Sequence, residues 1–432
     1  AKQDVEYSYV SGVYNDGLPY NGAIAKVNIH NTSSKNQKSK IVNPKWQFSI
    51  VSSKDKTKRV TTFIEEFKSE NKKETKIAWN GGYILNPELV GKLGLPESYI
   101  GSPLGLIISD NKLLSPPLFN KPAFIVYSDG TLDIKRVSSR NGITIAHPPT
   151  PSQREGEAIE FTASNYNKVL SANWRKDLGG ASCYYDLMYP EEYIEGNGRV
   201  IVRLAGNVIK EVIHTKDKQK IKIIPVGLTL SFTKDNFPES WDEIDKELII
   251  KINGIDNVYP SADGSQSEEA LPFGLSPPSG GIKGGLGLGG AVLHAVEAGP
   301  MLIDNGKNCL DMKEEGWKTQ NSIRTQAARL DFTDMRGPKI AIGLDKDGNL
   351  SVLTINGRIR ESVGATHIDM ADIMLKFGMQ KAMGFDPGGS STLVVNGKIL
   401  NISPYNSNYE KNVYSLPPEP RAVTNAVIGY LG

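Results

Sequence analysis

The chain has 432 residues, of which 39% are hydrophobic and 23% are charged, a composition typical of globular proteins. The 50 Lys and Arg residues nearly balance the 48 Asp and Glu residues, so the net charge is +2. No overall field therefore favours nucleic acid or an anionic membrane. The most apolar stretch, 285–303, is interrupted by His294 and Glu297. We expect neither a nucleic-acid partner nor a membrane span.

Two further features bear on the compartment of the protein. The chain starts with Ala1 and not Met, which fits a leader that has been removed or a shortened form. Cys183 and Cys309 are far apart and form no CxxC pattern. One disulfide or two buried thiols are equally compatible with this spacing.

The first predicted elements are strands and one helix. Apolar and polar residues alternate over 23–30 and 46–53, as in half-buried strands. A helix is predicted over 59–70 from four apolar residues at helical spacing, namely Val60, Phe63, Ile64 and Phe67.

Hairpins dominate the remaining chain. Asn-Gly and Asp-Gly between apolar runs indicate tight turns, because both central residues take positive φ. Four hairpins are predicted: 105–115, 124–137, 340–357 and 392–401, with turns at Asp110-Asn111, Asp129-Gly130, Asp347-Gly348 and Asn396-Gly397. A second helix is predicted over 367–379, with Thr366 as its cap and a buried face formed by Ile368, Ala371, Leu375 and Met379.

These elements predict an α+β fold, made mostly of β-strands and hairpins with a few packed helices. No linker divides the chain, so we expect a single elaborated domain over 1–432, with insertions at 86–103 and 147–197. The glycine-rich stretch 274–290 is interpreted as a connector or a lid. Its GLGLGG run (285–290) satisfies GxGxxG but has no strand before it and no helix after it, which argues against a dinucleotide site.

The stretch FDPGGSST (385–392) places a carboxylate, Asp386, before two glycines and three hydroxyl residues. Backbone N–H groups of glycines can form a nest for phosphate oxygens. A turn whose side chains bond to its own backbone explains the same residues equally well. A nucleophile elbow is excluded because Thr392 stands where GxSxG requires glycine, and a strand follows instead of a helix.

A wider pattern resembles the phosphodiester glycosidase family, the family of the mannose 6-phosphate uncovering enzyme. Five segments carry the resemblance in order: IAWNGGYI (77–84), AGPMLIDNGK (298–307), the hairpin-to-helix stretch 340–378, AMGFDPGGSSTLVVNGKILN (382–401) and PRAVTNAVIGYL (420–431). The family core is therefore expected over about 77–432. Two positions depart from the family pattern. Pro387 replaces the first of three glycines, and Lys339-Ile340 replaces Arg-Thr unless Arg324-Thr325 is the counterpart.

The resemblance implies a hydrolase that cleaves a sugar-1-phosphodiester bond in a glycan or an envelope polysaccharide. It implies Asp386 as the base or nucleophile, with Arg358 and Ser391 as further catalytic residues. The substrate-binding residues that it implies are Asn80, Gly81, Gly82, Lys339, Thr366, Gly388, Gly389, Ser390 and Thr392. No cofactor is required, and a divalent cation is left open. The expected partner is a carbohydrate or glycosyl phosphate, and the expected location is extracytoplasmic.

Two alternatives remain. A non-catalytic glycan-binding or cell-surface protein on the same fold is favoured by Pro387, which removes one N–H donor, and by Ile340, which lacks a hydroxyl. An ordinary polysaccharide glycosidase is the second alternative. Release of a phosphomonoester product would distinguish the proposed reaction from both.

Overall fold

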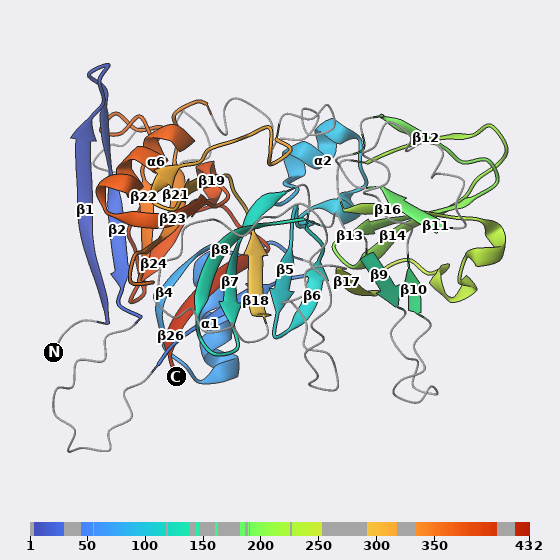
Figure 1. The fold of residues 1–432 in the computed structure, drawn as a ribbon, viewed down its shortest axis with the longest axis horizontal. Helices are drawn as coiled ribbons and strands as arrows, with labels where there is room; N and C mark the ends of the chain where they lie inside the picture. Colours follow the sequence, from blue (N-terminus) through green and yellow to red (C-terminus); the bar gives the residue numbers. More distant parts are fainter. Residues whose placement is uncertain are drawn as a thin grey trace.

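The computed structural model describes residues 4–29, 45–54, 56–117, 120–138, 143–146, 160–162, 182–185, 189, 191–224, 227–252, 292–317, 334–403 and 420–432. Antiparallel sheets make up most of this part of the chain (Figure 1). The helices within it are α1 (Val60–Asn71), α2 (Pro87–Leu93) and α6 (His367–Lys376), with short 3₁₀ helices η1 (Glu97–Tyr99), η3 (Lys234–Asn236), η4 (Glu239–Trp241) and η6 (Gly388–Ser390). The expectation of a mostly β, α+β fold is confirmed.

A seven-stranded sheet contains the β1–β2 hairpin at one end of the molecule (Figure 1). Its order is β1 (Val5–Val13), β2 (Pro19–Val27), β22 (Leu350–Ile355), β21 (Lys339–Asp345), β23 (Met379–Gly384), β19 (Met301–Asp304) and β20 (Lys307–Asn308). Helix α6 covers one face of this sheet, where Met370 and Met374 pack with Ala341 and Leu353. The other face contributes Ile340 and Val352 to the main core.

Two five-stranded sheets enclose the main core together with the seven-stranded sheet. The first has the order β25 (Lys398–Ile399), β24 (Leu393–Val395), β4 (Thr75–Asn80), β26 (Asn425–Leu431) and β3 (Trp46–Ser52). The second has the order β6 (Lys112–Ser115), β5 (Ile107–Ser109), β18 (Val292–Glu297), β7 (Lys121–Tyr127) and β8 (Leu132–Val137). Trp79 joins all three sheets, because its ring lies 5.8 Å from that of Phe124 and 6.1 Å from that of Phe385.

Smaller sheets extend the molecule on the far side of β7. They are β11 (Ser182–Tyr185), β16 (Leu228–Phe232), β13 (Val200–Ala205) and β14 (Val208–His214); β10 (Glu160–Thr162), β9 (Ile143–Ala146) and β17 (Ile249–Ile252); and β12 (Tyr193–Glu195) with β15 (Lys220–Lys222). These sheets share a second hydrophobic core with the sheet that contains β7. Because side chains alternate between the two faces of β7, Ala123 and Ile125 pack in this second core and Phe124 packs in the main core.

Most predicted local elements are confirmed. All four hairpins form at the predicted turns, and α1 buries Val60, Phe63 and Phe67 as expected. The segment 86–103 forms α2 and η1, and Leu89 and Tyr99 anchor it in the main core. Part of 147–197, the run 285–290 and Arg324-Thr325 lie outside the described residues. Cys183 and Cys309 are both free thiols.

The predicted buried face of α6 is confirmed only in part. Ala371 and Met379 are buried and Leu375 is partly buried, as predicted, but Ile368 is 55% exposed. The buried face also includes Met370, Met374 and His367, which the prediction did not select. Thr366 caps the helix as predicted: its hydroxyl accepts from the Asp369 N–H, and the Asp369 carboxylate accepts from the Thr366 N–H.

Candidate active site

Three segments of the main core meet around Asp386. Strand β23 ends at Gly384, β4 ends at Asn80 and β26 begins at Asn425. The Asp386 N–H donates to the Gly81 carbonyl at 3.3 Å, and the Gly81 N–H donates to the Asn425 carbonyl at 3.0 Å. The predicted segments 77–84 and 382–401 are therefore neighbours in space.

Asn80 links these segments through its side-chain amide. Its Nδ2 donates to the Asp386 carbonyl at 2.9 Å, and its Oδ1 accepts from the Thr392 N–H at 3.0 Å. Asn80 is completely buried. Both ends of the amide are thus engaged in holding the loop that carries Asp386.

Gly81 and Gly82 are required by close packing of the backbone. A Cβ on Gly81 would lie 1.8 Å from Asn425 Oδ1, and one on Gly82 would lie 2.2 Å from the Glu297 carbonyl oxygen. The Gly82 N–H donates to Asn425 Oδ1 at 2.8 Å. These glycines let β4 continue into the site against β26 and β18.

Asp386 is a buried carboxyl, 3% exposed. Burial raises its pKa to about 6, against the opposing effects of Arg421, a hydrogen bond with Ser390 and the charge of Lys121. A carboxyl with this pKa is mostly ionised at neutral pH and can still accept a proton, as a general base must.

Arg421 lies beside Asp386, and the sequence analysis did not select it. Its Nη2 lies 3.9 Å from Asp386 Oδ2 and donates to Ser390 Oγ at 2.6 Å. Its backbone N–H donates to the Gly389 carbonyl at 2.8 Å. Arg421 stands in PRAVTNAVIGYL, so the family resemblance itself contained the signal.

Gly388, directly after Pro387, has a backbone conformation that favours glycine. Gly388 has φ of +68°, and its N–H donates to the Pro338 carbonyl at 2.9 Å. That donor is therefore used within the protein. A Cβ on Gly388 would lie 3.5 Å from Arg358 Nη2, so the Arg358 guanidinium lies close to this loop.

Ser391 and Thr392 differ in how their hydroxyl groups are bonded. Thr392 Oγ1 donates to the Ser390 carbonyl at 3.0 Å. Ser391 Oγ is buried and has no hydrogen-bond partner among the described residues. A buried polar group without a partner is uncommon and is a reasonable position for a ligand contact.

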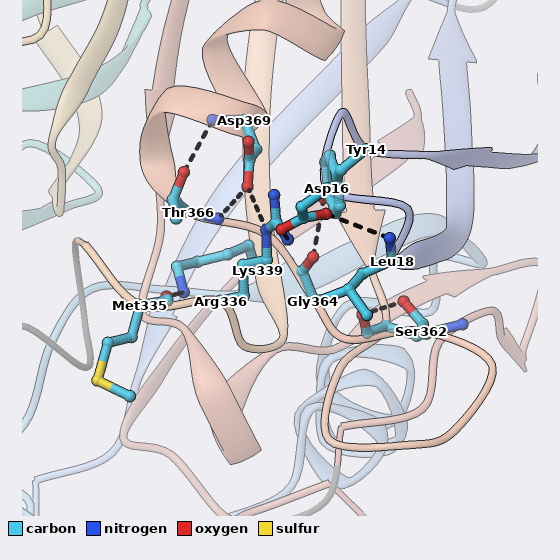
Figure 2. Close-up of polar contacts among 11 residues, drawn as sticks. Tyr14, Asp16, Leu18, Met335, Arg336, Lys339, Ser362, Gly364, Thr366 and Asp369 are labelled. Atoms are coloured by element: carbon cyan, nitrogen blue, oxygen red, sulfur yellow. Dashed lines mark hydrogen bonds and ion pairs between the residues drawn. The ribbon is translucent and has the colours of Figure 1, made fainter.

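Lys339 and Thr366 lie in a cluster of polar contacts that also includes Tyr14 and Asp16 at the tip of the β1–β2 hairpin (Figure 2). Lys339 is 1% exposed, and its Nζ lies 3.4 Å from the Met335 carbonyl oxygen. Arg336 bridges Asp16 at 2.5 Å and Asp369 at 3.3 Å.

A groove of about 610 Å³ lies elsewhere, between β3, α1 and the β7–β8 turn, and Trp46, Glu66 and His294 are among its lining residues. Strand β7 runs from Lys121 near Asp386 to Tyr127 at this groove, roughly 20 Å away. The groove is thus distinct from the Asp386 site.

The described ranges contain no group of three or more His, Cys, Asp or Glu side chains arranged to hold a metal ion. Among the same residues, no helix is long and apolar enough to cross a membrane.

Comparison with known proteins identifies the sequence family. The model of the family described as phosphodiester glycosidase matches residues 191–428, more than half of the chain. This range includes Asp386 and Arg421 and excludes Asn80 and Lys121. The SPbeta prophage-derived uncharacterized protein YomE of Bacillus subtilis (strain 168) is 36% identical over 87 residues, which cover 20% of this chain and 14% of that protein.

A solved structure shares the fold. A hypothetical protein from Synechocystis superposes with a TM-score of 0.52 at 14% identity, covering 99% of this chain and 62% of that one. The catalytic domain of zebrafish N-acetylglucosamine-1-phosphodiester alpha-N-acetylglucosaminidase, auto-inhibited by its pro-peptide, gives 0.44 at 12% identity, covering 98% and 83%. The chain thus spans less than two thirds of the Synechocystis protein and a small part of YomE.

Proposed function

Since the chain belongs to the phosphodiester glycosidase family, we propose that it hydrolyses a sugar-1-phosphodiester bond in a glycan or an envelope polysaccharide. In this reaction a water oxygen bonds to the anomeric carbon. The bond from that carbon to the phosphate oxygen breaks, and the phosphate leaves with the electron pair as a monoester. The proton of the water passes to a carboxylate and then to solvent.

The buried carboxyl of Asp386 beside Arg421 is the observation that carries this proposal. A phosphate monoester is a good leaving group, so the strong general acid of ordinary glycosidases is not needed. The reaction needs a carboxylate that activates the water or stabilises the anomeric carbon. It also needs cations that stabilise the negative charge on the phosphate oxygens. Asp386 has a pKa of about 6, and the Arg421 guanidinium lies 3.9 Å from it.

The remaining residues are assigned roles on the same basis. Arg421 and Arg358 supply positive charge on two sides of the loop 386–392. Ser391 supplies a hydroxyl that is unpaired within the described chain. Asn80 and Gly81 position the loop that carries Asp386. Lys339, at the start of β21, adds a positive charge.

The alternative of a non-catalytic glycan-binding protein has specific support. Pro387 contributes no N–H, and the Gly388 N–H is already bonded to Pro338, so the phosphate nest has fewer donors than its glycines suggest. A protein of this kind would keep affinity for glycans without turnover.

Family membership also supports an extracytoplasmic location, since envelope polysaccharide is found there. Fractionation of the producing cells, with a cytoplasmic enzyme as marker, tests this location. Recovery only with the cytoplasmic marker would contradict it.

Phosphorus NMR on a panel of α- and β-glycosyl-1-phosphodiesters tests the reaction. We expect conversion of a diester to a monoester, lost in Asp386→Asn and retained in Asp372→Asn, which alters an exposed carboxylate on α6. Retained glycan binding with no conversion by the unchanged protein would favour the binding-protein alternative. Release of sugar without a phosphomonoester would indicate an ordinary glycosidase.

A further inference from the structure

The groove beside β3 is a second place where the chain is shaped to hold a ligand. Its volume of about 610 Å³ lies in the range of small-molecule sites. It follows β3, the last strand of its sheet, with α1 on one side and the β7–β8 turn on the other. The match to the family model begins at residue 191, so these three elements lie outside it.

Aromatic rings line the groove on both sides of β3. The Trp46 ring stacks on that of Phe48, with the ring centres 5.9 Å apart and the planes 17° from parallel. The Tyr430 ring packs against that of Phe67 in α1, with the centres 5.0 Å apart. Phe48 and Phe67 are buried, whereas Trp46 and Tyr430 are partly exposed. The exposed rings are thus held by buried neighbours, so a ligand would order them at little further cost in entropy.

Carboxylates outnumber cations among the lining residues. The carboxylates are Glu66, Glu70, Asp110 and Asp129, and the lysines are Lys45 and Lys58. Lys58 Nζ donates to both carboxylate oxygens of Glu66, at 2.9 Å and 2.8 Å, so its charge is compensated. Burial lowers the pKa of His294, so its ring is neutral at pH 7. This balance disfavours an anionic ligand such as a phosphate.

Uncharged polar groups complete the lining. Gln47 and Asn71 are exposed amides. Ser49 Oγ lies 3.4 Å from the Tyr430 hydroxyl oxygen, where either group can donate. Amides and hydroxyls both donate and accept hydrogen bonds, as the hydroxyl groups of a sugar do.

A peptide strand added to the edge of β3 fits the groove less well. The Gly432 N–H donates to the Lys45 carbonyl at 2.9 Å, so the odd-numbered residues of β3 bond to β26. The backbone groups of Phe48 and Ile50 therefore face outward. The outward carbonyl of Ile50 already accepts from the Ser109 hydroxyl at 2.7 Å. An added strand would find this acceptor in use.

We propose that the groove is a binding site for an uncharged oligosaccharide. A sugar ring has apolar C–H faces that pack on aromatic rings, and a rim of hydroxyl groups that bond to amides, hydroxyls and carboxylates. The Asp386 site has the opposite character, because Arg421 supplies positive charge there. The groove therefore takes the sugar part of a glycan and not a phosphate. This inference goes beyond the proposed function, since binding in the groove requires no hydrolysis.

Indole ¹H–¹⁵N NMR tests the binding without any turnover. Trp46 is partly exposed, whereas Trp79, Trp241 and Trp317 are fully buried. Titration with maltohexaose, cellohexaose and N-acetylchitohexaose should shift the Trp46 signal, assigned with Trp46→Phe, in a saturable way for at least one of these sugars. In calorimetry, Trp46→Ala should weaken the binding of that sugar about tenfold, as expected for one lost aromatic contact.

Tyr9→Ala is the matched control, because Tyr9 is also an exposed aromatic residue, 64% exposed, but lies on β1 in another sheet. It should leave the binding unchanged. Glu70→Lys changes an exposed side chain of α1 and does not depend on the folding of Trp46→Ala. The unchanged protein should bind anionic hexagalacturonate more weakly than the uncharged sugar, and Glu70→Lys should reduce this difference.

No shift of the Trp46 signal with any of the three sugars, or equal weakening in Tyr9→Ala, would overturn the inference. A Trp46 shift with hexalysine and with none of the sugars would assign the groove to a basic peptide and would also overturn it. Asp386→Asn should bind the sugar as the unchanged protein does. Binding lost in Asp386→Asn and kept in Trp46→Ala would place the sugar at the Asp386 loop instead. Sugar binding at Trp46 supports the inference whether or not the phosphodiester panel shows turnover, so the two proposals fail separately.

Discussion

Arg421 donates two hydrogen bonds to the hydroxyl oxygen of Ser390, 3.2 Å from Nε and 2.6 Å from Nη2. Ser390 also bonds with Asp386 and lowers its pKa. One hydroxyl therefore fixes the guanidinium and contacts the candidate base. Arg421 and Ser390 are 31 positions apart in the chain, so this contact exists only in the folded protein.

Ser390→Ala should therefore impair activity through Asp386. The variant loses the acceptor that orients Arg421 and a bond that favours the ionised carboxylate, so the pKa of Asp386 rises. We expect kcat/KM near pH 6 to fall about 10²-fold, with partial recovery as the pH increases. A pH–rate profile that keeps the shape of the unchanged enzyme would contradict this mechanism.

Ser391→Ala provides the contrasting case. Its hydroxyl has no partner in the described part of the chain, so its removal should change the free energy of unfolding by less than about 1 kcal/mol. If Ser391 contacts the substrate, the rate should fall about 10²–10³-fold. Urea denaturation and steady-state kinetics measure the two quantities, and normal turnover on the true substrate would remove Ser391 from the site.

Asp386→Asn should stabilise the protein at neutral pH. The folded-state pKa of about 6 lies above the ordinary value of 3.8, so the folded protein binds the proton more tightly than the unfolded chain. Stability is therefore lost as pH rises from about 4 to 6, and the cost persists above pH 6. The rise of the pKa from 3.8 to about 6 corresponds to about 3 kcal/mol, which Asn should recover at pH 7.

The same comparison at low pH provides the control. Below about pH 4 both states carry a protonated Asp386, so the stability advantage of Asp386→Asn should disappear. A stability advantage of Asp386→Asn that is constant from pH 4 to pH 8 would show that burial of the ionised carboxyl does not destabilise the folded protein.

Gly81→Ala should strongly destabilise the fold. A Cβ at this position would overlap Asn425 Oδ1 at 1.8 Å, within a junction of two central strands. Such overpacking typically costs about 1–3 kcal/mol or more. Gly91→Ala is the matched control: it lies in α2, has nothing within 4 Å of its added Cβ, and should gain up to about 1 kcal/mol. Similar melting temperatures for the two variants would refute the packing argument.

Asn80→Ala should loosen the Asp386 loop. It leaves the Thr392 N–H and the Asp386 carbonyl buried without partners, at a cost of about 1–3 kcal/mol each. We expect faster amide exchange over 386–392 and lower kcat with little change in KM. If Asn80 bound the sugar instead, KM would rise while the exchange of the loop stayed the same.

Local patterns predicted the local structure well. The Asn-Gly turn has positive φ at both central residues, +47° at Asn396 and +78° at Gly397, whereas in the two Asp-Gly turns only Gly130 and Gly348 have positive φ. The buried face of α6 was predicted only in part, because helical spacing fits more than one face. The sheet also buries Met370 and Met374, and no local signal specifies that choice.

The candidate site was predicted only in part. Asp386 and its glycines stand together in the sequence, so their loop was visible. Arg421 reaches Asp386 through a contact between segments far apart in the chain, which spacing along one sequence does not encode. Lys121 begins β7 and looks from the sequence like a surface residue, yet it is buried beside the Tyr83 and Trp317 rings.

Strand β26 lies between β4 and β3, and each of them pairs with it along its length. The two outer strands are made early in synthesis, while their shared partner emerges after most of the chain. At a synthesis rate of about 5–20 residues per second, β3 and β4 remain without their shared partner, and so with unpaired edges, for tens of seconds. The nascent chain is thus exposed to aggregation during this interval, and chaperone binding to β3 or β4 would be most useful then.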